Sequence, residues 1–312
     1  MHVPLLERYR DSLPVSQKTP LVTLGEGSTP LVRAGRISAR LGVEIWLKWE
    51  GANPTGSFKD RGMAVAVAKA LEEGARGVVC ASTGNTAASA AAYAARAGIE
   101  AIVAYPAGAV AASKLVQVRA AGARLLEIRG SFEDAFSAAL ELAEAEHFTF
   151  VNSTNPNRLE GQKTAAFEII EQLGGAPDVL ALPYGGGGNT AAYAKGFLET
   201  GSLPRLHPVE AQTRPETVAS AIRIAVPVHR REVDVAVARS GGSVISVSDD
   251  EIAAAWRSLA REEGLFCEPA SAAPIAGLAR GAAALGERVV CVLTGHGLKD
   301  PAAVDLLAER GA

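Results

Sequence analysis

From about residue 44 onward, short apolar runs rich in β-branched residues alternate with alanine-rich stretches that are long enough for helices. The apolar runs predict strands at residues 44–50, 77–82, 100–105, 123–128, 149–151, 179–183, 207–211, 244–247 and 288–294. The stretches between them predict helices at residues 60–73, 85–97, 113–121, 132–146, 159–173, 189–199, 215–224, 249–263, 270–284 and 301–308. Because a parallel strand needs a long crossover before it can pair again, this alternation is typical of βαβ units. The pattern therefore predicts parallel sheets with helices on both faces.

The number of strands bears on the domain count. Nine strands would strain a single layer in a chain of 312 residues, so two sheets in two domains are expected. The predicted fold class is α/β, with two doubly wound, mainly parallel sheets. The smaller domain is expected at residues 45–148, and the larger one at residues 1–44 plus 149–312. Ligands of such folds bind at the carboxyl ends of strands and often between two domains, and a bound cofactor is expected there.

Charge and composition exclude several classes of function. The formal net charge is −3 and the pI is about 6.0, so no basic surplus exists to bind a nucleic acid. Charged residues interrupt residues 1–20, and polar residues interrupt the longest uncharged stretch, 77–95, so neither a secretion signal nor a membrane span is expected. The three cysteines and five histidines lack the spacing of a metal site or a disulfide framework. The chain is expected to be a reduced, cytoplasmic protein without a metal.

Five predicted strand-to-helix junctions are polar or rich in glycine, and the first contains a lysine. Residues 50–62 do not form a nucleotide-binding P-loop, because Lys59 stands three residues after Gly56 and no serine or threonine follows it. At the start of a helix the positive end of the helix dipole repels a lysine, which favours the neutral amine needed for a Schiff base. Taken alone, a solvated lysine beside Asp60 remains the ordinary interpretation.

The second and third junctions offer hydrogen-bond donors. Residues 81–89 place hydroxyls and the Asn85 amide at a predicted helix N-terminus, which suits a carboxylate or a ring oxygen. Residues 152–164 combine amides and hydroxyls with Arg158, whose forked guanidinium suits a phosphate. An ordinary surface loop is the alternative for the third junction.

The remaining junctions are weak signals when each is considered alone. Consecutive glycines from Gly185 to Gly188, followed by Asn189, allow backbone N–H groups to converge on a phosphate. A dinucleotide-binding G-x-G-x-x-G motif is incomplete here, since its third glycine is missing. The fifth junction places the Thr294 hydroxyl at a strand end, before a tight turn. Together the five junctions supply a covalent anchor, a ring-oxygen partner, a phosphate cradle and a ring-nitrogen partner, which predicts a pyridoxal phosphate enzyme.

Seven runs carry a resemblance to a known family. They are GEGSTPL at 25–31, EGANPTGSFKDRGM at 50–63, STGNTAAS at 82–89, NSTNPNRLEGQKTAAFEI at 152–169, RPETVASAIRI at 214–224, FCEPASAA at 266–273 and TGHGLKDP at 294–301. With these runs the chain resembles the threonine synthases, pyridoxal phosphate enzymes of fold type II, the tryptophan synthase β-like family. The resemblance extends from about residue 20 to residue 301.

The resemblance implies an activity and a set of site residues. The activity is the conversion of O-phospho-L-homoserine and water to L-threonine and phosphate, by γ-elimination and β-hydration in a homodimer. Lys59 would form the Schiff base and act as acid and base, Phe58 would line the ring, Asn85 would bond the ring oxygen O3′, and Thr294 would face the pyridine nitrogen. The implied cradle of the cofactor phosphate is Gly185, Gly186, Gly187, Gly188 and Asn189. The substrate carboxylate would be held by Ser82, Thr83 and Thr86, and the substrate phosphate by Lys114, Asn152, Ser153 and Arg158.

The chain departs from the family pattern at three places, and alternatives follow from them. The phosphate loop contains GGGGN in place of GNAGN, the stretch 211–245 is shortened, and GEGSTPL replaces GEGNTPL. A dehydratase acting on threonine or serine is the nearest alternative, since the loops of dehydratases are richer in glycine. A pyridoxal-phosphate-binding protein without catalysis is an alternative of another class, suggested by the shortened stretch. The interpretation as a nicotinamide-dependent dehydrogenase would be supported by the glycine run alone.

Overall fold

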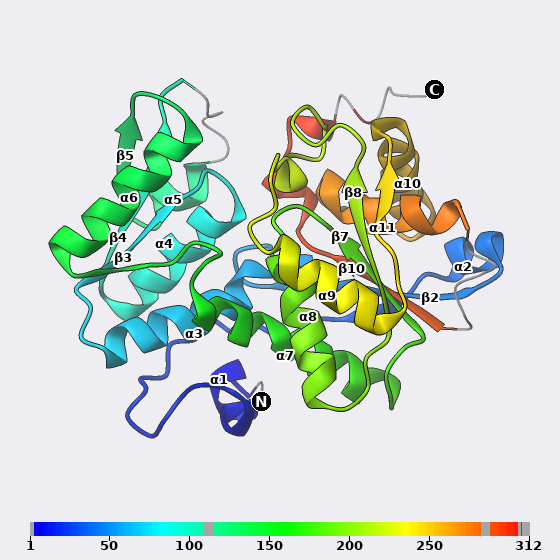
Figure 1. Cartoon of the computed structure of the whole chain (residues 1–312), viewed down its shortest axis with the longest axis horizontal. Helices are drawn as coiled ribbons and strands as arrows, with labels where there is room; N and C mark the ends of the chain where they lie inside the picture. The colour runs from blue at the N-terminus through cyan, green and yellow to red at the C-terminus, as the bar shows by residue number, and fades with distance from the viewer. Residues whose placement is uncertain (1–2, 109–114, 282–287, 305–306, 308–312) are drawn as a thin grey trace. The chain divides into compact units, whose positions relative to one another are not determined.

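The computed structural model describes residues 3–108, 115–281, 288–304 and 307 (Figure 1). The chain divides into two compact units, each with its own sheet. The first unit comprises Met1–Gly27 and Asn53–Thr164, and the second comprises Ser28–Ala52 and Ala165–Ala312. The unit boundary falls within helix α7 (Pro156–Leu173), which begins in the first unit and ends in the second.

The first unit is built on a four-stranded parallel sheet in the order β5-β4-β3-β6. Its strands are β3 (Gly77–Ala81), β4 (Glu100–Pro106), β5 (Arg124–Ile128) and β6 (Phe148–Phe150). Helices α1 (Leu5–Arg8), α3 (Lys59–Glu72), α4 (Asn85–Ala97), α5 (Val116–Ala120) and α6 (Phe132–Glu146) complete the unit. Alternate residues of β3 and β4 pack against alanines that recur every four residues on one face of α6, at 135, 139 and 143. These small side chains let α6 lie close to the sheet.

The second unit contains a six-stranded sheet in the order β1-β2-β10-β7-β8-β9. Its strands are β1 (Leu31–Arg33), β2 (Glu44–Trp49), β7 (Val179–Pro183), β8 (Arg205–Ala211), β9 (Ile245–Val247) and β10 (Arg288–Leu293). Only β1 runs antiparallel to its neighbour among these strands. The helices of this unit are α2 (Gly35–Leu41), α8 (Gly188–Glu199), α9 (Arg230–Ser240), α10 (Asp249–Glu262) and α11 (Pro269–Ala279).

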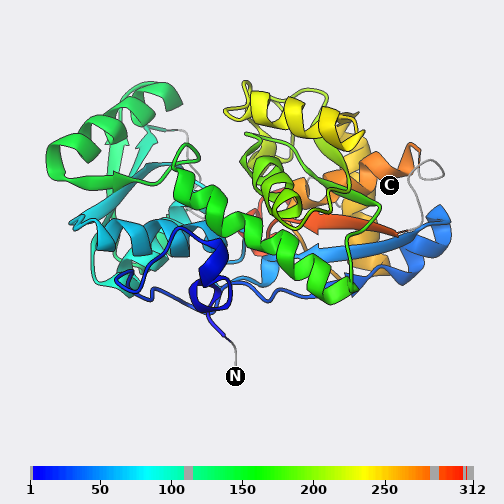
Figure 2. The same cartoon turned by 60° about the horizontal axis from the view of Figure 1, so that its bottom comes forward.

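Both faces of the second sheet are buried. Alternating residues of its central strands point to opposite sides, so that Ala181 and Cys291 belong to a cluster with α10 and α11, while Leu180 and Val290 belong to a cluster with α7 and α8. Figures 1 and 2 show helices on both faces of this sheet. The predicted α/β class with two mainly parallel, doubly wound sheets is therefore confirmed.

The two units differ from the domain ranges expected at 45–148 and at 1–44 plus 149–312. β2 pairs with β10 in the second sheet, and β6 pairs with β3 in the first sheet. Residues 1–27 group with the first unit. Periodicity identifies a strand but not its partner, because the partner is chosen by hydrogen bonds to a distant segment.

One predicted helix was wrong, and three helices and a strand were not predicted. Residues 215–224 contain only a short 3₁₀ turn at Ser220–Ile222, because side chains take up the backbone groups of this stretch: Arg223 donates to the Thr217 carbonyl, and Asp249 accepts from the Val218 N–H. The unpredicted elements are β1, α1, α2 and α9. The helices predicted at 113–121, 270–284 and 301–308 extend beyond the described residues.

A buried ion pair ties the GEGSTPL turn to α7 within the second unit. Lys48 Nζ donates to Glu168 Oε2 at 2.8 Å and to the Thr29 carbonyl at 2.9 Å, while Glu168 Oε1 accepts from the Ser28 N–H at 2.7 Å. Lys48 and Glu168 are both fully enclosed. The Ser28 backbone has φ +49, a left-handed conformation in which asparagine is several-fold enriched over serine.

Replacing Ser28 by asparagine should stabilise the protein. The exposed side chain leaves room for the larger amide, and the left-handed backbone is less strained for asparagine, so we expect the free energy of unfolding to rise by about 0.5–1 kcal/mol. Chemical denaturation measures this change. The control is Ser28→Ala, which keeps the strained Cβ without the amide and should not stabilise. A loss of stability in Ser28→Asn would contradict the explanation.

Candidate active site

Two loops of the first unit lie side by side at the carboxyl ends of β3 and β6. These strands are neighbours in the sheet, and the Val151 N–H continues their pairing by donating to the Val79 carbonyl at 2.9 Å. The Asn152 amide bonds both backbone groups of Ala81, accepting from its N–H at 2.8 Å and donating to its carbonyl at 2.9 Å. Asn152 therefore holds the two loops together, a role that its position in the sequence did not reveal.

The loop after β3 leads directly into the N-terminus of α4. Ser82 Oγ accepts from the Gly84 N–H at 3.2 Å, which shapes the turn before the helix. The N-cap residue of α4 is Gly84, which has no side chain to cap the helix, so the positive end of the helix dipole and its first N–H groups suit an anion. The structure places four predicted site residues here, all partly exposed: Ser82, Thr83, Asn85 and Thr86.

Arg158 lies at the beginning of α7, beside the loop after β6, and only 1% of it is exposed. Its Nη1 donates to the Val151 carbonyl at 3.2 Å, but Nε and Nη2 have no hydrogen-bond partner among the described residues. Burial lowers the pKa of the guanidinium to about 10. A buried cation with two unused donors is rare in a protein interior, because burial without partners is unfavourable. Such a group suits a phosphate ligand.

Two further residues complete the predicted phosphate site. Ser153 is partly exposed and follows Asn152 in the loop after β6. Lys114 lies outside the described residues.

Lys59 is the first residue of α3 and is partly buried. Its Nζ lies 4.4 Å from the centre of the Phe58 ring. The preceding turn is held by the buried Asp60 carboxylate, which accepts from the Thr55 N–H and the Thr55 hydroxyl at 2.6 Å and from Ser89 Oγ at 2.7 Å. Asp60 thus fixes the turn from which Lys59 projects, a contribution that the sequence did not show.

In the second unit, the glycine loop and Thr294 follow the neighbouring strands β7 and β10. Gly187 has φ +86, a conformation that suits glycine, and precedes α8. No side chain caps α8, and neither the Gly186 nor the Gly187 N–H has an acceptor among the described residues. The buried Asn189 Nδ2 and Thr190 Oγ1 also lack hydrogen-bond partners within the described ranges. These unused groups at a helix N-terminus fit the phosphate of pyridoxal phosphate.

Thr294 contacts a carboxylate, that of Glu268, which was not among the site residues predicted from the sequence. Its hydroxyl donates to Glu268 Oε1 at 2.9 Å and lies 3.1 Å from Ser271 Oγ. Glu268 precedes α11, where the helix dipole stabilises a negative charge. A Cβ on Gly295 would lie 2.5 Å from the Glu268 carboxyl carbon, so a larger residue there would displace this carboxylate. The FCEPASAA run contains Glu268, but nothing in it indicates the contact with Thr294.

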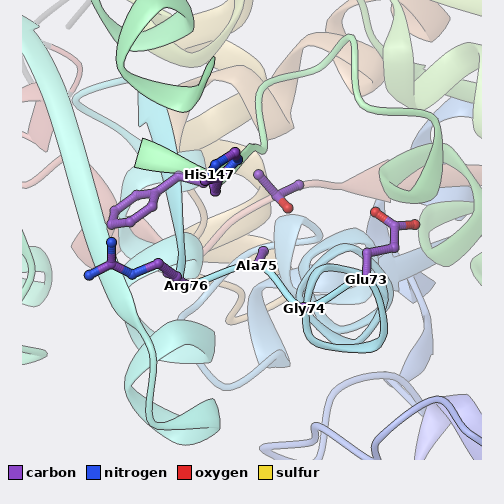
Figure 3. A pocket seen from close by; sticks show the side chains of 7 residues that line it. Glu73, Gly74, Ala75, Arg76 and His147 are labelled. Atoms are coloured by element: carbon purple, nitrogen blue, oxygen red, sulfur yellow. The ribbon is translucent and has the colours of Figure 1, made fainter. Parts of the chain in front are cut away.

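A hollow of about 440 Å³ lies elsewhere in the first unit, at the amino ends of β3 and β6 (Figure 3). It is lined by Glu73, Gly74, Ala75, Arg76, His147, Phe148 and Thr149. Figure 3 shows Glu73 and Arg76 on opposite sides of it rather than converging on one point. Ligand sites of parallel sheets form at the carboxyl ends, so this hollow is not the candidate site.

The part of the chain that the structure describes contains no metal site and no disulfide bond. Its histidine, cysteine and acidic side chains form no cluster suited to a metal ion. Cys80, Cys267 and Cys291 are free thiols, and burial raises the pKa of each. Among the described helices, none is both long and apolar enough to span a membrane.

Comparisons with known proteins identify the family. The family model described as pyridoxal-phosphate dependent enzyme matches residues 22–295. The threonine synthase of Halalkalibacterium halodurans is 52% identical over 95% of this chain and 90% of its own length, and that of Methanocaldococcus jannaschii is 46% identical over 97% and 82%. The processed form of threonine deaminase isoform 2 from Solanum lycopersicum has a TM-score of 0.82 at 25% identity, covering 98% of this chain and 88% of that structure. The chain belongs to the pyridoxal-phosphate-dependent enzymes and, within them, to the threonine synthases.

Proposed function

We propose that this enzyme converts O-phospho-L-homoserine and water to L-threonine and phosphate. The observation that carries the substrate assignment is Arg158, a buried guanidinium with two nitrogens that lack acceptors among the residues that the structure describes. A dehydratase substrate such as threonine carries no phosphate and would leave both nitrogens unsatisfied. The names of the relatives at about half identity support the same activity.

In this proposal, the cofactor contacts are those that the resemblance implies. The backbone N–H groups from Gly185 to Gly188, together with Asn189, bind its phosphate. Thr294 bonds the ring nitrogen, Asn85 bonds O3′, Phe58 lines the ring, and Lys59 Nζ holds the cofactor covalently. When bound, pyridoxal phosphate supplies an electron sink that weakens the bonds to hydrogen and oxygen in an attached amino acid.

The remaining site residues bind the carboxylate and the phosphate of the substrate. The uncapped N-terminus of α4, with Ser82, Thr83 and Thr86, binds the α-carboxylate. Arg158 and Ser153 donate to the substrate phosphate, Asn152 positions their loop through Ala81, and Lys114 is proposed as a further phosphate ligand. Lys59 Nζ removes and returns the protons at carbon. These bonds hold the substrate at both ends, so that the carbons between them are presented to Lys59.

Phosphate release from O-phospho-L-homoserine, with L-threonine identified as the co-product, tests the proposal. We expect stoichiometric release of phosphate and threonine by the purified full-length chain. The same protein is then given L-threonine, and 2-oxobutyrate is measured. Rapid 2-oxobutyrate formation without phosphate release from the first substrate would favour the dehydratase. Bound cofactor without turnover of either substrate would favour the noncatalytic alternative.

We also propose that the enzyme is a cytoplasmic homodimer. This assignment follows from the resemblance to the threonine synthases. Light scattering of the purified protein measures its mass, and a monomer would contradict the dimer.

A further inference from the structure

Arg214 connects three segments of the second unit through one guanidinium. Its Nε donates to Glu210 Oε2 at 2.9 Å, and its Nη2 bonds the same carboxylate. Its Nη1 donates to the Gly185 carbonyl at 3.1 Å and to the Ile224 carbonyl at 3.3 Å. The guanidinium also lies 4.5 Å from the centre of the Tyr184 ring. The side chain therefore joins the end of β8, the glycine loop after β7 and the segment around residue 224.

The direction of the Gly185 carbonyl determines the direction of the next N–H. Because a trans peptide unit is planar, its carbonyl and its N–H point to opposite sides. By holding the Gly185 carbonyl, Arg214 turns the Gly186 N–H away from itself. The His229 N–H donates to the Gly186 carbonyl at 2.9 Å and in the same way turns the Gly187 N–H. Neither glycine N–H has an acceptor among the described residues, so both are available to an anion.

The chain around residues 222 and 233 lies so close to the glycine loop that the loop has no room for side chains at Gly185 and Gly187. A Cβ on Gly185 would lie 2.9 Å from Ile222 Cα, and a Cβ on Gly187 would lie 2.9 Å from Val233 Cγ2. A loop of glycines has high backbone freedom and no side chains of its own to restrain it. Its conformation therefore depends on restraints from outside, and Arg214 and His229 supply them.

We propose that Arg214 is a positioning residue for the cofactor-phosphate loop. It sets the affinity for pyridoxal phosphate by aiming the Gly186 N–H, without contacting the cofactor itself. This inference rests on the proposed assignment of the glycine loop to the cofactor phosphate. Lysine cannot replace the residue, because it lacks the planar fork that bonds a carboxylate and a carbonyl together.

The test compares Arg214→Lys with Arg280→Lys in the full-length chain. Arg280 is a matched control, since its Nε and Nη2 bond the Glu251 carboxylate and its Nη1 donates to the Ser246 carbonyl, away from the glycine loop. Each protein is stripped of cofactor and titrated with pyridoxal phosphate, and the ³¹P resonance of the bound phosphate is recorded. We expect Arg214→Lys to bind the cofactor about tenfold more weakly, with a shifted or broadened resonance, and Arg280→Lys to match the parent protein.

A second variant keeps the inference testable if Arg214→Lys folds poorly. Gly187→Ala introduces the Cβ that meets Val233 and should weaken cofactor binding in the same way. Unchanged affinity and resonance in both Arg214→Lys and Gly187→Ala would overturn the inference and leave the proposed function intact. Equal losses in Arg214→Lys and Arg280→Lys would also overturn it, since the effect would then be one of general stability. If the parent protein binds pyridoxal phosphate and the cofactor phosphate proves to lie elsewhere, the loop assignment and the inference fail together.

Discussion

Replacing Arg158 by methionine should lower kcat/KM for O-phospho-L-homoserine and at the same time raise the stability of the protein. Charge-assisted hydrogen bonds to a phosphate contribute about 1.5–3 kcal/mol each, so the loss of even one should lower kcat/KM by roughly 10- to 100-fold. The free energy of unfolding should change in the opposite direction, because the described part of the free protein gives two nitrogens of this buried guanidinium no hydrogen-bond partner. Its pKa of about 10, against 12.5 in water, corresponds to roughly 3 kcal/mol of unfavourable burial.

Steady-state kinetics and thermal unfolding of the same preparation measure both changes. Methionine has a similar length and is apolar, so it can fill the space without leaving a charge buried. Arg158→Lys is the companion variant: it keeps a charge but loses the fork, and should lose activity without gaining stability. A lower kcat/KM together with a higher stability in Arg158→Met would identify Arg158 as a binding residue. A loss of both would identify a structural residue, and normal kinetics would refute the phosphate assignment.

Replacing Lys59 by alanine should abolish turnover and covalent attachment of the cofactor. The acid–base role alone is worth about 10²- to 10⁴-fold in rate, and the loss of the attachment point adds to this. Borohydride reduction followed by peptide mass spectrometry should find the cofactor on Lys59 in the parent protein and on no lysine in the variant. The ³¹P spectrum should still show bound cofactor phosphate, because the glycine loop is intact.

Lys69→Met provides the control for Lys59→Ala. Lys69 belongs to the same helix and pairs with Glu72 on its surface side. Its replacement removes a lysine from α3 without touching the proposed site, and turnover should stay close to that of the parent protein. Substantial turnover by Lys59→Ala would show that another lysine carries the cofactor.

One of the two departures within 185–189 has a physical explanation. GGGGN differs from GNAGN at Gly186 and Gly187, and at Gly187 φ is +86 and a Cβ would lie 2.9 Å from Val233 Cγ2. Glycine at 187 is therefore favoured by the backbone and by packing in this chain and is no sign of a dehydratase, whereas packing does not explain glycine at 186, where a Cβ would meet Ile224 Cδ1 at an ordinary 3.4 Å. The third departure, Ser28, occupies a left-handed turn position that also accepts serine, at some strain.

The sequence by itself determined the elements and the cofactor. The helices at 85–97 and 132–146 and the strand at 179–183 have the predicted bounds, because a helix or a buried strand is encoded by local periodicity. The candidate site loops could be predicted for a related reason: each follows directly after a predicted strand. In a parallel sheet, this order along the chain places them at the carboxyl edge.

Only the tertiary structure decided which distant segments meet. It assigned β2 and β6 to their sheets, replaced the helix expected at 215–224 by an irregular segment held by side chains, and set Glu268 behind Thr294. It also buried Arg158 with two donors that have no partner in the described ranges, and it placed the Arg214 guanidinium against the Gly185 carbonyl. None of these features has a period or a local signal, because each depends on contacts between residues far apart in the chain. The sequence therefore identified the chemistry, while long-range packing determined which groups remain free to perform it.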